Sequence, residues 1–200
     1  MPSQAPLRCR CGAVRGVVTP VSPSVGTRVI CYCASCQAFA RFLGGTDILD
    51  AQGGSDILQV SPSHVRIAEG ADNLRAMRLT EKGLIRWYAD CCKTPVGNTI
   101  GGGFPFIGIV QPFMTHDASG LSRDELIGPP AGRIWGEAAI GGCPPGATAR
   151  APVKLLPKMA GNILGWWIGG KGAPNAFFDV KTKRPISEPK VLTAAERAAI

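Results

Sequence analysis

The stretch VICYCASCQAFARFLGG, residues 29–45, places Cys31, Cys33 and Cys36 directly before a segment with a helical pattern. A disulfide needs two thiols and a closed structural zinc site usually needs four, whereas three thiolates leave a zinc ion with an open position. We therefore expect these three cysteines to form one metal-binding group. A helix predicted over 35–43 would point its N-terminus at the group and lower the pKa of its thiols.

Four other cysteines of the eight in the chain form two close pairs. Cys9 and Cys11 lie in a CxC pattern, which on a strand directs both side chains to one face. Cys91 and Cys92 are adjacent, in a predicted turn next to Pro95. Together the two pairs predict a closed four-thiolate zinc site, which would tie the N-terminus to a distant hairpin and contribute directly to the folding free energy.

Two other interpretations of the clustered cysteines stay open. All seven can be structural ligands of two zinc ions, with the second site completed by His64 or Cys143, or they can be buried small hydrophobic residues. His64 and His116 are predicted to lie in loops. The spacing favours two zinc ions, with the metal ligands Cys9, Cys11, Cys31, Cys33, Cys36, Cys91 and Cys92.

Composition indicates a globular protein with many turns. Hydrophobic residues make up 45% of the 200 residues, and 26 glycines with 17 prolines favour short strands. The chain shows no secretory signal and no apolar run of the roughly 18 residues that a membrane span needs, so we expect a cytoplasmic protein. In a reducing cytosol, cysteines are more often metal ligands than disulfide partners.

The formal net charge of +8 permits an anionic substrate or a polyanionic partner without requiring either. No run of lysine and arginine is interleaved with aromatic residues, and we therefore do not expect nucleic-acid binding. Arg41 and Arg86 stand near the cysteines in the sequence and are candidates for binding a substrate carboxylate.

Hydrophobic alternation predicts a mainly β fold in the first part of the chain. A hairpin turn is predicted at 81–83. The predicted strands are 12–18, 27–32, 55–61, 64–70, 74–80, 83–90 and 104–110.

Past residue 115 the sequence pattern changes, and it predicts helices rather than strands. We divide the chain into a zinc-binding domain, 1–115, and a C-terminal extension, 116–200. A short helix is predicted over 122–128 with Ser122 as its N-cap, and a longer helix over 157–169 is expected to pack on the core or at an interface. The Gly161 and Gly165 pair in it is expected to allow close packing. The last 25 or so residues are predicted to form a surface tail with a helical end.

The cysteine segments together resemble a known family. CRCGAV at 9–14, CYCASCQ at 31–37 and WYADCCKTP at 87–95 are similar to motifs of the glutathione-dependent formaldehyde-activating enzymes, a domain family that includes the centromere protein V type. The resemblance covers roughly residues 7–112 and is closest to a bacterial branch of that family.

This resemblance implies a β-tent fold, built of antiparallel sheets pinned by zinc. It implies a structural zinc that joins the first and third cysteine groups, with the matching ligands Cys9, Cys11 and Cys92. It also implies a reactive zinc on the catalytic-type residues Cys31, Cys33 and Cys36. The activity implied is the joining of formaldehyde to glutathione, a step of the carbon–sulfur lyase class, with the small thiol as partner.

The chain departs from the family in its third cysteine group. The family usually has CxxC there, whereas this chain has Ala89 at the first position and an additional Cys91. Neighbouring residues on a strand face opposite ways, so Cys91 and Cys92 can bind one ion only where the backbone turns. We expect Cys91 to replace the missing ligand, with Asp90 as the reserve candidate.

Two functional hypotheses follow. The first is a zinc enzyme that binds a thiol or small electrophile at the open position beside Cys31, Cys33 and Cys36. The second is a non-catalytic binding or scaffold module in which both zinc ions are structural. A homo-oligomer is compatible with either.

Overall fold

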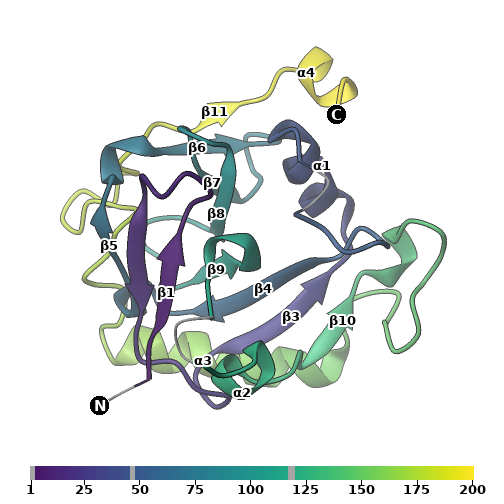
Figure 1. Ribbon diagram of the computed structural model, residues 1–200, viewed down its shortest axis with the longest axis horizontal. Helices are drawn as coiled ribbons and strands as arrows, with labels where there is room; N and C mark the ends of the chain where they lie inside the picture. Colours follow the sequence, from purple (N-terminus) through teal and green to yellow (C-terminus); the bar gives the residue numbers. More distant parts are fainter. Residues whose placement is uncertain (1–2, 46–47, 117–119) are drawn as a thin grey trace.

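The computed structural model describes residues 3–45, 48–116 and 120–200, and it is mainly β, as the sequence predicts (Figure 1). A small sheet contains β1 (Ala5–Arg8), β2 (Arg15–Val18) and β5 (Val65–Glu69), in that order. A large sheet contains, in spatial order, β10 (Gly132–Ile134), β3 (Thr27–Cys31), β4 (Ser55–Val60), β9 (Ile107–Val110), β8 (Thr94–Thr99), β7 (Ile85–Ala89), β6 (Leu74–Arg78) and β11 (Lys190–Val191).

Helices are short and lie around the sheets (Figure 1). The α-helices are α1 (Ala34–Phe42), α2 (Arg123–Ile127), α3 (Leu156–Ile168) and α4 (Ala194–Ala198). Single 3-10 turns are η1 (Pro62–His64), η2 (Ala71–Asn73), η3 (Gln111–Phe113), η5 (Gly136–Ala138) and η6 (Val153–Leu155). No helix in the described ranges is long and apolar enough to cross a bilayer.

Antiparallel pairing, as expected, holds within the small sheet and through the middle of the large one. The two edges of the large sheet differ, because β10 pairs with β3 and β11 pairs with β6 in parallel. Both edge strands come from the C-terminal part of the chain, which reaches them from far along the sequence. The sheet is therefore mixed rather than purely antiparallel.

Strand β8 occupies the segment TPVGNT, which the strand patterns of the sequence missed. Proline lacks an N–H donor and is disfavoured inside a sheet. A register shift between Trp87 and Tyr88 places Tyr88 opposite Pro95 and accommodates the proline. Gly97 is required for close approach, since a Cβ there would lie 2.8 Å from the carbonyl oxygen of Gly108. Strand β8 thus depends on contacts with its neighbouring strands, which the strand propensities of its residues do not predict.

The main hydrophobic core centres on Trp87 of β7, whose side chain is fully buried. Its ring centroid lies 5.2 Å from that of Phe177 and 5.7 Å from that of Phe178, and both phenylalanines are buried. The indole N–H donates to the hydroxyl of Thr99, at 2.9 Å, so its polar atom is satisfied. The segment after residue 115 therefore supplies part of this core.

The C-terminal helices start and end close to their predicted positions. Ser122 caps α2 in a capping box with Glu125. Helix α3 was predicted within one residue at each end, but the expected close packing at Gly161 and Gly165 is wrong, because a Cβ at either glycine would have no neighbour within 4 Å. The predicted surface tail carries β11 and then α4.

Phe177→Ala tests whether the C-terminal part stabilises the core. Deleting a fully buried aromatic ring leaves a cavity beside Trp87, and we expect a loss of about 3–5 kcal/mol in the free energy of unfolding. Chemical denaturation at a fixed zinc concentration measures it. The control, Phe104→Ala, removes a ring that is 39% exposed and should cost less than about 1 kcal/mol. Equal losses for the two variants would contradict the assignment.

Candidate metal centres and the adjoining pocket

The first candidate metal centre, the Cys9 group, brings together the sulfurs of Cys9, Cys11, Cys91 and Cys92, which all lie within 4.8 Å of one another. Cys9 lies 3.6 Å from Cys11 and 3.9 Å from Cys91. Cys11 lies 3.3 Å from Cys91, which lies 3.8 Å from Cys92. Four sulfurs around a zinc ion at about 2.3 Å form a tetrahedron with edges of about 3.8 Å. These distances fit a metal ion bound by four thiolates.

Two turns build the Cys9 group, and one of them differs from the prediction. Cys9 and Cys11 do not lie on a strand, since β1 ends at Arg8 and both sit in the turn that follows it. Gly12, with a φ of 78°, completes this turn. The backbone N–H of Val14 donates to the Cys9 sulfur at 3.2 Å. The turn, rather than strand alternation, therefore places both side chains on one side.

The second turn, between β7 and β8, brings adjacent cysteines to the same group. Lys93 has a φ of 53°, so the backbone reverses directly after Cys92. This turn lets Cys91 join Cys92, as the sequence predicts, in the group that lacks a cysteine at position 89. Asp90, the reserve candidate, instead forms an ion pair with Lys93.

Neighbouring groups set the thiol pKa values in the Cys9 group. Burial tends to raise the pKa of Cys92, but hydrogen bonds from the hydroxyl of Thr94 and from Cys11 lower it to about 6. The Thr94 oxygen lies 3.1 Å from the Cys92 sulfur. Burial raises the pKa of Cys9 and of Cys91. A cation is therefore needed before all four sulfurs are thiolates near neutral pH.

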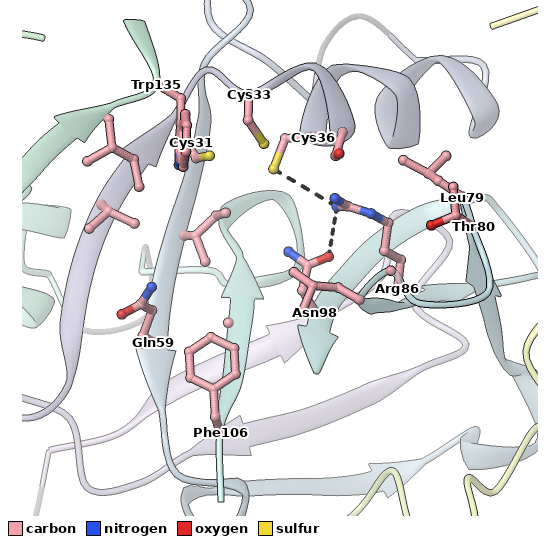
Figure 2. A pocket seen from close by; sticks show the side chains of 17 residues that line it. Cys31, Cys33, Cys36, Gln59, Leu79, Thr80, Arg86, Asn98, Phe106 and Trp135 are labelled. Carbon is pink, nitrogen blue, oxygen red and sulfur yellow. Dashed lines mark hydrogen bonds between the residues drawn. The ribbon is translucent and has the colours of Figure 1, made fainter. Parts of the chain in front are cut away.

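The second candidate metal centre, the Cys31 group, consists of Cys31, Cys33 and Cys36, whose sulfurs also lie within 4.8 Å of one another (Figure 2). Cys31 ends β3, Cys33 is the N-cap of α1, and Cys36 lies in the first turn of that helix. Cys31 and Cys36 are each only 7% exposed. Among the described residues, no fourth cysteine, histidine or carboxylate joins them.

Helix α1 begins at the Cys31 group as predicted, but it does not lower the pKa of every thiol. Hydrogen bonds from Cys31 and then from Cys36 lower the pKa of Cys33, and the charge of Arg86 adds to this effect. Donating a hydrogen bond to Cys33 raises the pKa of Cys31. Cys36 also has a raised pKa, despite its own bond with Cys31. In the absence of a metal, Cys33 is therefore the thiolate, and the thiols of Cys31 and Cys36 stabilise it by hydrogen bonds.

Arg86 of β7 is a charged side chain that contacts the Cys31 group (Figure 2). It is 3% exposed, and its Nη1 donates to Asn98 Oδ1 at 3.0 Å and to the Cys36 sulfur at 3.9 Å. The guanidinium also stacks over the ring of Phe39, with its Cζ atom 5.3 Å from the ring centroid. No carboxylate in the described ranges pairs with it. Its charge therefore complements the negative charge of the Cys31 group.

The Cys31 group opens into a pocket of about 500 Å3 (Figure 2). Its walls are mostly apolar, with Arg86 and Asn98 among the few polar groups. Besides the three cysteines, it is lined by Val29, Ser35, Ile57, Gln59, Leu79, Thr80, Gly83, Leu84, Arg86, Asn98, Phe106, Gly108, Ile134 and Trp135. A cavity of this size with a few convergent polar groups is typical of a small-molecule site.

The sequence predictions missed several pocket residues. Asn98 and Phe106 come from β8 and the segment just before β9, and Trp135 follows β10, so that widely separated positions meet at one cavity. Trp135 has a φ of 61°, an uncommon conformation for a bulky residue that is found where the surrounding structure demands it. Trp135 lies far from the three cysteines along the chain, so the sequence alone could not predict that they line one pocket.

The remaining candidates lie apart from both groups. Arg41 is exposed and does not line the pocket. His64 has a buried Nδ1 without a partner, and burial lowers its pKa. Neither His64, His116 nor Cys143 belongs to a metal-binding group of the described residues. A fixed fourth ligand for the Cys31 group from His64 or Cys143 is therefore not found.

Comparisons with known proteins give a family but no activity. The model of a family of unknown function (DUF6151) matches residues 1–190. A solved structure of a Rhodobacter sphaeroides protein is 17% identical, covers 59% of this chain and 91% of its own, and has a TM-score of 0.40. No curated protein matches significantly. What the protein does therefore has to be argued from its own residues.

Cys91→Ser tests the Cys9 group. Losing one of four thiolates should reduce bound zinc from about two ions per chain to about one and lower the thermal midpoint, because metal binding contributes to folding. Elemental analysis and calorimetry measure the two effects. Cys143→Ser is the matched control, since this exposed thiol belongs to neither group and should keep both ions. Two zinc ions in Cys91→Ser would overturn the assignment.

Proposed function

Because the chain belongs to the DUF6151 family, whose function is unknown, we propose from its own site that it is a zinc protein that handles a small thiol. The Cys9 group would hold a structural zinc ion and the Cys31 group a second one. The observation that carries this proposal is the Cys31 group itself, three sulfurs without a fourth ligand among the described residues, opening into a pocket.

The donor set of the Cys31 group fits zinc. Zinc prefers soft thiolate ligands and four-coordinate geometry, and catalytic sites supply three protein ligands. In such a site, the metal lowers the pKa of a thiol in the remaining position, so that the thiol is held as the nucleophilic thiolate. Three thiolates with one zinc ion leave one net negative charge, which the buried Arg86 balances.

Arg86 would bind an anionic group of the thiol. Its Nη1 donates to Asn98, and the side chain also lines the pocket. Among the described residues, no hydrogen-bond acceptor is found for Nε or Nη2. Guanidinium donors suit a carboxylate. A thiol that carries a carboxylate would therefore lie with its sulfur at the Cys31 group and its anionic end on Arg86.

The pocket walls would exclude water from the sulfur. Val29 and Ile57 pack in one cluster with Cys31 and Cys36, and Phe106 adds apolar surface at the other end of the pocket (Figure 2). A dry site strengthens the attraction between Arg86 and a bound anion, because fewer water dipoles screen it. The same walls favour a small electrophile with little charge as the second reactant.

The resemblance of the cysteine segments to glutathione-dependent formaldehyde-activating enzymes supports carbon–sulfur chemistry at this site. In that reaction the thiolate sulfur forms a bond to the carbonyl carbon of formaldehyde, and the carbonyl oxygen takes up a proton. No histidine or carboxylate lines the described pocket, so that proton would come from solvent at the mouth of the pocket, outside the apolar walls. Glutathione is the thiol that the resemblance favours.

The lack of an acid or base in the pocket lining also favours the second candidate function, a zinc-stabilised binding module without catalysis. In that case the fourth position beside the Cys31 group would be closed by a fixed ligand in solution. Ligand exchange at the zinc distinguishes the two functions.

X-ray absorption at the zinc edge makes this distinction. With four sulfurs at one site and three at the other, the average count is about 3.5 sulfurs per zinc, and glutathione should raise it to about four by supplying one more. An average that glutathione leaves unchanged would contradict the open site. Cys36→Ser should lose one zinc ion while the fold and the Cys9 group are retained.

Arg86→Met tests recognition of the anionic end of the thiol. Removing a charge-assisted hydrogen bond costs about 1.5–3 kcal/mol, so glutathione affinity of the zinc-loaded protein should fall by roughly 10- to 100-fold. Titration calorimetry measures it, with zinc content checked first because Arg86 is buried. The control, Arg41→Met, alters an exposed arginine outside the pocket and should leave affinity unchanged. Equal affinities for the two variants would exclude Arg86 from binding.

A further inference from the structure

Helix α3 turns an apolar face to solvent. Leu164 is 53% exposed, Trp167 70% and Ile168 79%, and Val153 in the preceding turn η6 is also 79% exposed. At 100° per residue, the helix residues of this set, with Leu156, occupy one continuous arc. Surface helices normally place charged or polar residues there. On α3, this solvent-exposed arc is apolar instead. We call it the α3 face.

The opposite side of α3 already attaches it to the protein. Leu155 is buried in the cluster that includes Cys31, and Met159 packs against that cluster. Asn162 donates from Nδ2 to the hydroxyl of Thr27, at 3.1 Å. The orientation of the helix is thus fixed from its inner side. The α3 face remains largely exposed to solvent.

A shallow apolar cavity of about 380 Å3 continues the α3 face. It is lined by Phe104 and Pro105 together with Ile163, Leu164 and Trp167. Phe104 is itself 39% exposed. The apolar surface therefore extends from the helix onto the loop before β9. Contiguous exposed apolar surface of this kind marks an interaction site rather than isolated surface residues.

Positive charge flanks helix α3 along the chain. Between Glu137 and Asp179 the sequence contains Arg150, Lys154, Lys158 and Lys171 and no acidic residue. The three lysines are exposed and lie just before the helix, in its first turn and just after its end.

We propose that the α3 face docks on an anionic lipid bilayer, with the helix lying in the plane of the headgroups. Exposed tryptophan, leucine and isoleucine would enter the boundary between headgroups and acyl chains, and Lys154 and Lys171, at the two ends of the helix, would contact lipid phosphates. Tryptophan is enriched at that depth of a membrane. The proposal is independent of the chemistry at the cysteine groups.

Charge decides between a bilayer and a second copy of the chain. A two-fold interface brings the same patch of both subunits together, so the lysines that flank each helix would approach those of the other copy, and this stretch of chain has no acidic residue to pair with them. An anionic lipid surface supplies the missing opposite charge. The helix has 13 residues, about 20 Å in length, and lies on the surface because a span needs about 30 Å.

Vesicle co-sedimentation of the zinc-loaded full chain tests the proposal. The chain should sediment with vesicles of phosphatidylcholine and phosphatidylglycerol in equal parts, much less with phosphatidylcholine alone, and be released by high salt. The double variant Trp167→Ser with Ile168→Ser should bind at least about tenfold more weakly, because two apolar side chains no longer leave water. Ile140→Ser with Ile186→Ser, also exposed but outside the α3 face, should bind like the unchanged chain.

Three results would overturn the proposal. One is absence of sedimentation with the anionic vesicles at low salt. Another is equal binding by the two double variants, which would place the contact elsewhere. The third is a dimer in analytical ultracentrifugation that the Trp167 and Ile168 variant abolishes, which would assign the α3 face to a second copy of the chain.

Discussion

Thiolates held within a few ångströms repel one another unless a cation lies among them, and seven cysteines of this protein are gathered in that way at two places. Without a metal, burial raises the pKa of Cys9 and the hydrogen bond to Cys33 raises the pKa of Cys31, so protonation of these two sulfurs lowers the repulsion. With a cation, the same sulfurs attract it and draw their turns together. Metal binding and folding are therefore coupled in this chain.

The Cys9 group and the Cys31 group differ in how the repulsion between their thiolates is relieved. Four sulfurs of the Cys9 group complete a tetrahedron between two surface turns, so that the group joins the small sheet to the large one. The Cys31 group is buried, has three sulfurs, and faces a cavity. Arg86 belongs to the second group in an electrostatic sense, because a guanidinium buried without a carboxylate is stable only beside negative charge. The closed group suits structure and the open one suits a ligand.

Sequence could predict the parts of this protein that depend on local spacing. The CxCxxC pattern before a helix placed the Cys31 group correctly, and Ser122 correctly marked the start of α2. Strand β8 was missed because Pro95 and Gly97 argue against a strand locally, although the bulge opposite Tyr88 and the carbonyl of Gly108 accommodate them. The pocket could not be predicted, since its lining depends on which strands pair. One of these strands, β10, has only three residues, too few to give a strand pattern in the sequence.

The two short edge strands, β10 and β11, have a consequence for how the protein is made. They cover the outer backbone groups of β3 and β6, which would otherwise offer open hydrogen-bonding edges to other chains. Because β11 follows β10 along the chain, the edge of β6 is covered later during synthesis than the edge of β3. A nascent chain that contains β10 but not yet β11 therefore exposes the edge of β6, where it can associate with its own copies on the way to the folded state.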